Sequence, residues 1–463
     1  MKLILVILII ILALLTRLAL LNIRPLHHDE GVNYSFAKQI LETQTFTYNP
    51  LNYHGPLYFF ILALSFALLG ISEFSLRLPA AIFGILIILL PIIFSKSKNK
   101  YLASIFLILS PSLMYYSRYS IHESLFVLST MTILYISIQV IETKSLKQFP
   151  ILATALALAV TTKETITITI LTLILIIFLN LKEIKKLQLK NQKKIILLSL
   201  IVFLVIYITF FTSFFTNTQG LIGSIKSYFP WLNRGFTELG HTKPWHYYLF
   251  LLLKYEFPIL ILAIIAIPKS LRNKNLFAKN LLIWLLVTLL IYSLISYKTP
   301  WLIINISVPM AILASQGIQI LKNKKLKYTV ITISIIFLSM NSLDLNFLMP
   351  WQSTNPFAYV HTDKDTLNLV EEINYNYQEN SKILILSNEY WPLPFYLDKK
   401  NVMYLDQAQT FSPADYPEYD IFIVKDEILD NNQNIEEPEN FKHGQYSLRK
   451  GIILHLFIKR NNF

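Results

Sequence analysis

Two apolar runs, 165-TITITILTLILIIFLN-180 and 195-IILLSLIVFLVIYITFFTSFFT-216, flank the basic segment 182-KEIKKLQLKNQKK-194. A helix rises 1.5 Å per residue, so runs of this length reach most or all of the way across about 30 Å of hydrocarbon. A lysine-rich segment between such runs resists translocation and marks the inner side of a membrane. The pattern predicts a polytopic membrane protein whose basic loops set the topology.

The same alternation of apolar and basic segments continues along the 463 residues. The chain is 54% hydrophobic and only 15% charged, which is far from the composition of a soluble globular protein. The first apolar run contains Arg17 and precedes no clear small-residue cleavage site, so we expect an uncleaved anchor. The other apolar runs are 56–71, 77–94, 101–116, 123–141, 149–162, 245–267, 280–297, 301–321 and 328–345, and the first is 3–21.

The number of spans depends on how residues 56–71 are assigned. If this run lies at the membrane interface, the short inner segments carry 20 Lys and Arg residues and the outer segments carry 8. Counting it as a span would put the lysine clusters outside, against the positive-inside rule. The charge distribution therefore predicts eleven spans, with the N-terminus inside and the C-terminus outside. Seven carboxylates then fall on the outer side: Asp29, Glu30, Glu42, Glu73, Glu123, Glu164 and Glu238.

The composition changes after residue 345. Residues 1–350 have a net charge of +20, whereas residues 351–463 have a net charge of −7. Short β-rich runs at 382–387, 402–405, 420–425 and 446–459 accompany a charged helical stretch at 363–378. We expect an all-α membrane domain over 1–345 and a small soluble α/β domain over 346–463, placed outside. The basic residues are topology signals, so no nucleic acid is expected as a partner, and the chain has no cysteine for disulfides.

The segment 27-HHDEGVNYSFAKQILETQ-44 follows the first span and has the pattern of an amphipathic helix at the membrane surface. Asp29 and Glu30 stand where this helix begins. Acidic residues favour a helix N-terminus, so the pair has a purely structural interpretation. The alternative is a carboxylate that accepts a proton from an acceptor hydroxyl or that binds a divalent cation.

Three further outer positions carry ionisable side chains. Within 115-YYSRYSIHESLF-126, the loop residues Arg118, His122 and Glu123 are unusual because charges near a bilayer are costly, although charges at span ends commonly reach the interface. The turn 161-TTKET-165 carries Lys163 and Glu164, for which pairing with each other is one alternative. The turn 297-YKTPW-301 carries Lys298, which either anchors a helix or holds a lipid phosphate.

Two other features leave alternatives open. Lys254 and Glu256 interrupt the apolar run 245–267, so either 245–253 is an interfacial helix and the span starts near Phe257, or the two side chains line a cavity. Six histidines fall outside, including His54, but their spacing matches no compact zinc motif.

The order of these motifs resembles the membrane glycosyltransferases of the GT-C superfamily. The matching segments are HHDEGVNYSFAKQI, HGPLYFFIL (54–62), SEFSLRLPAAIFGIL (72–86), YYSRYSIHESLF and TTKET. Within the superfamily the chain is similar to the dolichyl-phosphate-mannose protein mannosyltransferase group, which includes the bacterial lipid A aminoarabinose transferases. Later segments at 240–258, 297–309, 355–362 and 391–397 resemble a prokaryotic branch known as flippase-activity-associated membrane proteins.

The resemblance implies a polyprenyl-phosphate sugar donor, a protein, lipid or glycan acceptor, and inverting transfer at the outer face of the cytoplasmic membrane. It implies catalytic roles for Asp29, its neighbour Glu30, and Glu123. It also implies juxtamembrane helices in the first outer loop, in agreement with the interfacial assignment of 56–71. A divalent cation, Mg²⁺ or Mn²⁺, is a candidate cofactor, with Asp29 and Glu123 as its candidate ligands.

Five further residues are predicted to bind substrate. By position, Arg118 and Lys298 are candidate contacts to the lipid phosphate, and His54, Lys163 and Glu164 are further substrate contacts. The leading hypothesis is a glycosyltransferase. The alternative is a non-enzymatic component of lipid-linked sugar flipping, or a protein that binds cell-envelope glycans through its outer domain.

Overall fold

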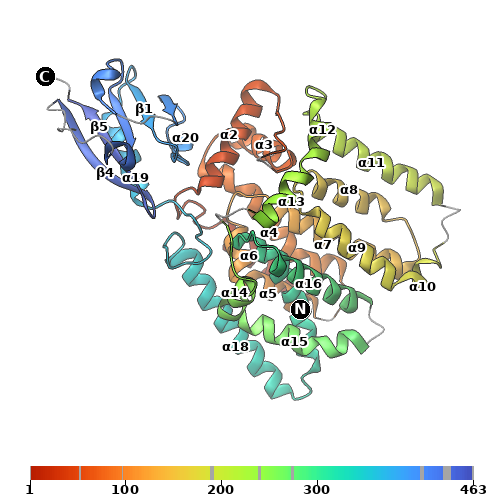
Figure 1. Cartoon of the computed structure of the whole chain (residues 1–463). Helices are drawn as coiled ribbons and strands as arrows, with labels where there is room; N and C mark the ends of the chain where they lie inside the picture. Colours follow the sequence, from red (N-terminus) through yellow and green to blue (C-terminus); the bar gives the residue numbers. More distant parts are fainter. Residues whose placement is uncertain are drawn as a thin grey trace. The chain divides into compact units, whose positions relative to one another are not determined.

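The computed structural model describes residues 2–51, 54–95, 97, 99–187, 192–237, 241–272, 276–406, 411–430 and 440–460. The predicted fold class is confirmed, because the described chain is mostly helical with one small C-terminal sheet (Figure 1). Its contacts form two compact units. We call residues 1–21 and 37–348 the helical unit, and residues 22–36 and 349–463 the sheet unit. Glu238, one of the predicted outer carboxylates, lies outside the described residues.

The helical unit is built from apolar helices joined by short loops. The first half comprises α1 (Lys2–Leu18), α2 (His28–Thr43, which starts in the sheet unit), α3 (Leu57–Leu69), α4 (Glu73–Phe94), α5 (Lys100–Leu109), α6 (Pro111–Tyr116), α7 (Glu123–Thr143), α8 (Phe149–Val160), α9 (Ile166–Leu179) and α10 (Leu181–Ile184). The second half comprises α11 (Lys193–Phe211), α12 (Gln219–Lys226), α13 (Tyr228–Thr237), α14 (Tyr247–Tyr255), α15 (Phe257–Arg272), α16 (Leu276–Leu294), α17 (Ile304–Gly317) and α18 (Lys324–Leu343). The predicted helix at 27–44 is thus found as α2.

Among the described residues, six helical segments are long and apolar enough to cross a membrane, and the bent pair α14–α15 would make a seventh. Shorter apolar helices are α3, α5, α8 and α9. At 1.5 Å per residue, the 13 residues of α3 reach about 20 Å, which is short of a bilayer core, but α8 and α9 are similar in length. Helix length alone therefore does not separate the predicted interfacial helix from predicted spans, and the count of eleven stays a prediction.

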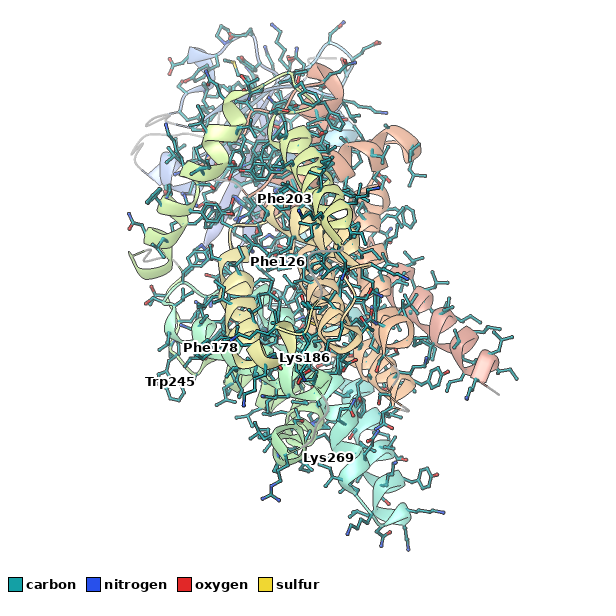
Figure 2. All side chains as sticks on the ribbon, turned by 90° about the vertical axis from the view of Figure 1, so that its right-hand side faces the viewer. Phe126, Phe178, Lys186, Phe203, Trp245 and Lys269 are labelled. Atoms are coloured by element: carbon teal, nitrogen blue, oxygen red, sulfur yellow. The ribbon has the colours of Figure 1, made fainter. Side chains whose placement is uncertain are left out.

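Two of the basic segments, around Lys186 and Lys269, lie on the same side of the helical unit (Figure 2). Helices α8 and α11 pack side by side in the right half of Figure 1, where α10 follows the end of α9. Figure 2 turns this end toward the viewer and labels Lys186, next to α10, and Lys269, in the last turn of α15. Alternating spans require this arrangement, because two lysine-rich inner loops must lie on the same side.

The helical path is interrupted between α5 and α6 and between α14 and α15, and polar side chains meet at these two breaks. The chain bends by 108° between α14 and α15 at Glu256, so α15 begins at Phe257. One of the two alternatives stated from the sequence also has the span start near Phe257. The Glu256 carboxylate is fully buried and accepts hydrogen bonds from Ser110 Oγ (2.6 Å), Ser112 N (3.1 Å) and Ser112 Oγ (2.7 Å) at the break between α5 and α6. A buried carboxylate is stable only when such donors surround it.

The sheet unit contains a five-stranded mixed sheet. Its strands are β1 (Lys382–Leu386), β2 (Asn401–Leu405), β3 (Ile421–Lys425), β4 (Phe441–Arg449) and β5 (Ile452–Lys459), in the order β2-β1-β3-β5-β4. The first three are parallel, and β5 pairs antiparallel with β3 and β4. The run predicted at 446–459 is the end of β4 plus β5, because a turn at Gly451, whose φ is +81°, reverses the chain.

Both faces of this sheet are covered. One core includes Ile383, Ile385, Ile421 and Ile423, and the other includes Leu384, Leu386, Phe422 and Val424. Because successive side chains of a strand point to opposite faces, apolar runs such as 383–386 supply both cores. Helix α19 (Asp365–Asn376) packs on the first face, and the short helices α20 (Leu393–Tyr396) and α21 (Asp426–Asp430) complete the unit.

Helices α15 and α17 pack closely at Gly317, which leads to a test of the fold. A Cβ atom on Gly317 would lie 2.0 Å from the carbonyl oxygen of Leu262. We expect Gly317→Ala to force the helices apart and to lower the free energy of unfolding by about 1–3 kcal/mol, measured by thermal unfolding in detergent. Gly235→Ala is the control, because its Cβ would meet nothing closer than 3.6 Å. Equal stability of the two variants would contradict this packing.

Candidate active site

The acidic pair lies in the sheet unit, in the first turn of α2. His27 precedes the helix, and its Nδ1 accepts a hydrogen bond from Asp29 N at 3.0 Å. Glu30 reaches back to accept from His27 N at 3.0 Å. This reciprocal arrangement resembles a capping box, except that histidine replaces the usual Ser or Thr and accepts from the second backbone N–H of the helix instead of the third. The local sequence therefore starts the helix at the acidic pair.

The two carboxylates differ in exposure. Glu30 is fully buried by the cap, whereas Asp29 exposes 39% of its side chain. His27 Nε2 lies 2.8 Å from the carbonyl oxygen of Tyr359, so His27 donates there while its Nδ1 accepts from Asp29 N. Burial lowers the pKa of His27 to about 3, which keeps the ring neutral in this role. Asp29 is thus the member of the pair that an external group can reach.

The helical unit holds a second group of polar side chains. We call Tyr48, His54, His122, Glu123, Lys163, Glu164 and Trp231 the His54 cluster. Glu164 Oε1 accepts a hydrogen bond from Tyr48 OH at 2.9 Å, and Glu164 Oε2 lies 2.8 Å from His54 Nδ1. Lys163 forms an ion pair with Glu123, and both side chains are almost fully buried. Lys163 and Glu164 therefore pair with partners from other segments and not with each other.

Backbone contacts hold these segments together. Gly55 N and Leu57 N donate to the carbonyl oxygens of Thr162 and Thr161, each at 3.1 Å. A Cβ atom on Gly55 would lie 2.2 Å from the Thr161 oxygen, so only glycine fits this approach. The His54 motif and the TTKET turn, far apart in sequence, thus meet directly.

Aromatic rings surround the hydrogen-bonded pair. The ring of His54 stacks on Trp231 at 4.4 Å between centroids and meets His122 edge-on at 5.3 Å. The guanidinium of Arg234 lies 4.9 Å from the Trp231 ring. His122 Nε2 and Trp231 Nε1 are buried and have no hydrogen-bond partner within the described part of the chain. The cluster therefore combines aromatic surfaces with polar atoms that a ligand could satisfy.

The two predicted phosphate contacts face backbone carbonyls. Arg118 donates to the oxygens of Thr16, Arg17, Ala19 and Leu20 at the end of α1, at 2.6–3.4 Å. Lys298 is almost fully buried and donates to the carbonyl oxygen of Ile295. A lipid phosphate would have to compete with these carbonyls for either cation. Their phosphate-binding role stays a prediction.

The arrangement of the carboxylate and histidine side chains gives little support for a metal site. Glu123 is already paired with Lys163, whose positive charge offsets the negative charge that would attract a divalent cation. Among the residues that the structure describes, no group of three or more His, Asp or Glu side chains is arranged to hold a metal ion.

Sequence reasoning did not select Tyr48, His122, Trp231 or Arg449 as site residues. Tyr48 has no local motif, and it reaches Glu164 from 116 residues away. Arg449 lies 421 residues from its partner His28. His122 lies in the segment 115–126, whose ionisable residues the sequence singles out. Only the folded chain shows that its Nε2 has no hydrogen-bond partner among the described residues.

The chain matches known proteins over one segment and in its overall fold. A family model described as dolichyl-phosphate-mannose-protein mannosyltransferase matches residues 53–210. The structure resembles ArnT from Cupriavidus metallidurans bound to undecaprenyl phosphate, with a TM-score of 0.70, 14% identity and 97% of each chain covered. The apo form of that ArnT gives a TM-score of 0.68 at the same identity and coverage.

A second similar structure is the archaeal oligosaccharyltransferase AglB from Archaeoglobus fulgidus in complex with an inhibitory peptide and a dolichol-phosphate. Its TM-score is 0.60 at 10% identity, with 91% of this chain and 69% of that chain covered. No protein among those with curated functions matches the sequence. The chain thus shares the fold of these ArnT and AglB structures, and the resemblance predicted from the sequence is confirmed by this fold and by the family model over residues 53–210.

Glu164 gives a pH-dependent test of the cluster. Burial raises its pKa from 4.5 to about 7. The folded chain then holds this proton more tightly than the unfolded chain, so the group's contribution to stability is full below about pH 4.5 and declines as pH rises to about 7. We expect the Glu164→Gln variant to lack this decline. Between about pH 5 and pH 8, its free energy of unfolding should therefore rise relative to that of the wild type by on the order of 3 kcal/mol.

The measurement is thermal unfolding in detergent at both pH values. Glu42→Gln is the control, because Glu42 is exposed on α2 and pairs only at the surface with Lys38 at 3.6 Å. A difference between Glu164→Gln and wild type that is the same at both pH values would contradict the burial-raised pKa.

Proposed function

We propose that this chain is a membrane glycosyltransferase that moves a sugar from a polyprenyl-phosphate donor to a protein, lipid or glycan acceptor. The observation that carries the proposal is the GT-C fold over 97% of the chain, shared with a structure that holds undecaprenyl phosphate. The transfer would take place at the outer face of the cytoplasmic membrane, where the charge distribution predicts that Asp29, Glu123 and Glu164 lie.

In the proposed reaction Asp29 is the general base. Its carboxylate accepts the proton of the acceptor hydroxyl or amine, and the freed electron pair attacks the anomeric carbon of the sugar. The bond from that carbon to the lipid phosphate breaks, and its electrons leave with the phosphate. A single displacement of this kind inverts the anomeric configuration. We assign the base role to Asp29 and not to Glu30, because the cap at His27 buries Glu30.

Negative charge builds on the leaving phosphate. Fixed cations aimed at that charge stabilise the transition state more than the ground state. Lys298 and Arg118 remain our candidates for this role, and either would exchange a backbone carbonyl for a phosphate oxygen. An exchange of this kind would make the cation available only when the lipid is bound.

We assign the His54 cluster to substrate binding. Sugars bind through hydroxyl groups and through the apolar faces of their rings, so they need convergent polar atoms beside aromatic surfaces. The cluster offers the buried nitrogens of His122 and Trp231 and the paired carboxylates Glu123 and Glu164. Burial lowers the pKa of His54 and of His122 well below the usual value, so both rings are neutral at physiological pH.

The base assignment predicts a specific loss of activity. Asp29→Asn removes the proton acceptor but keeps a polar side chain in the first turn of α2. We expect the rate of sugar transfer to fall by about 10²- to 10⁴-fold, while the protein still inserts and folds. Transfer is measured in proteoliposomes that contain the purified chain, with a panel of undecaprenyl-phosphate-linked hexoses and pentoses. Acceptors are identified by mass spectrometry of surface glycans from cells with and without the gene.

The matched control is Glu42→Gln, which removes an exposed carboxylate from the same helix and should leave transfer unchanged. Unchanged transfer in Asp29→Asn would overturn the assignment of the base. Movement of labelled lipid across the vesicle membrane without any sugar transfer by wild type would instead identify a component of lipid-linked sugar flipping.

A further inference from the structure

The segment that carries the acidic pair is anchored to the C-terminal domain along its length. Residues 22–36 belong to the same compact unit as residues 349–463. Leu26 N donates to Tyr396 OH at 2.8 Å, and His27 Nε2 bonds the carbonyl oxygen of Tyr359 at 2.8 Å. Nearly two turns into α2, Tyr34 OH donates to Asp398. The start of α2 is therefore fixed by residues that lie more than 300 positions away.

The first turns of α2 rest directly on the loop that follows β1. A Cβ atom on Gly31 would lie 2.9 Å from Pro392 Cα and 3.1 Å from the ring of Trp391. The rings of Tyr34 and Phe395 meet edge-on at 5.1 Å. Glycine at position 31 lets helix and loop approach closely, and the helix cannot slide or rotate without a clash.

Arg449 joins three elements at this contact. It lies at the end of β4, and its side chain is almost completely buried. Its Nη2 donates to the carbonyl oxygen of Trp391 at 2.8 Å, and its Nη1 lies 3.4 Å from His28 Nδ1. A planar guanidinium can serve both partners at fixed angles, which a flexible ammonium cannot.

The charge of Arg449 also acts on Asp29. The two groups attract each other, and Glu389 Oε2 lies 3.6 Å from Arg449 Nη2. The other titratable groups around this contact are His27, His28 and Glu30 at the start of α2, and His361, whose ring stacks on His27 at 5.8 Å.

We propose that the C-terminal α/β domain positions the catalytic segment, and that Arg449 is a positioning residue that fixes the first turn of α2 and, with it, the location of Asp29. The catalytic part of this inference rests on the proposed function. Arg449 acts through Asp29 and His28 and touches no substrate in this role.

The first test is independent of activity. Hydrogen–deuterium exchange is measured for the peptide covering residues 22–36 in the full-length protein in detergent. We expect Arg449→Gln to speed exchange in the first turns of α2 by at least about tenfold, because the contact that ties the helix to β4 is lost. Lys450→Gln is the control, since Lys450 is the exposed next residue of the same hairpin. Equal exchange in both variants would overturn the positioning role.

The second test uses the transfer assay in proteoliposomes with undecaprenyl-phosphate-linked sugars. Arg449→Gln should lower kcat by about 10- to 100-fold with little change in the KM for the lipid donor. Arg449→Lys keeps the charge but loses the planar fork that serves Trp391 and His28, so it should also lower kcat. Lys450→Gln should leave both kcat and KM unchanged.

The outcomes separate the two proposals. If wild type transfers no sugar but the exchange difference is seen, the glycosyltransferase proposal fails and the anchoring stands. If wild type is active and Arg449→Gln loses activity only in proportion to its folded fraction, with kcat per folded molecule unchanged, Arg449 has a merely structural role and the inference fails.

Discussion

Where a helix ends or breaks inside a bilayer, its unpaired backbone groups must find partners within the protein, because lipid offers none. This constraint governs much of the helical unit. Arg17 donates to the carbonyl oxygens of Leu107 and Ile108 at the end of α5, and Arg77 donates to that of Leu21. Arg118 serves the end of α1 in the same way. Buried cations in an apolar chain thus first complete the backbone, and any role toward a ligand is added to that.

The acidic residues also divide into buried carboxylates that complete the structure and Asp29, which is partly exposed. Glu30 completes a helix cap, Glu123 is paired with Lys163, and Glu256 closes the break between α5 and α6. Each of these carboxylates is buried and matched by nearby donors. Asp29 differs because it combines partial exposure with a neighbouring buried cation. A group that remains accessible while its surroundings are fixed is suited to chemistry, since little reorganisation is needed when it reacts.

The sequence predicts those features that depend on neighbouring residues. Apolar runs, basic loops and the amphipathic pattern of 27–44 predict the fold class and helix α2, because these signals are local. The turn at Gly451 was missed because the run 446–459 reads as continuous β structure. The ion pair of Glu123 with Lys163, the hydrogen bond of Tyr48 to Glu164 and the contact of Arg449 with His28 could not be predicted, because they join segments 40 to 421 residues apart. The span count and the roles of the predicted site residues stay predictions.

The division of the chain between its two units bears on how such a protein can be rearranged or evolve. The polypeptide passes from one unit to the other at three places, after Leu21, after Phe36 and after Leu348. A domain joined by one linker can be exchanged or lost in a single recombination event, whereas this one includes an internal stretch of fifteen residues. Removing residues 349–463 would uncover the buried face of that stretch, including Leu26 and Tyr34. A chimaera with another C-terminal domain must therefore inherit the matching first loop, so that the two segments change together.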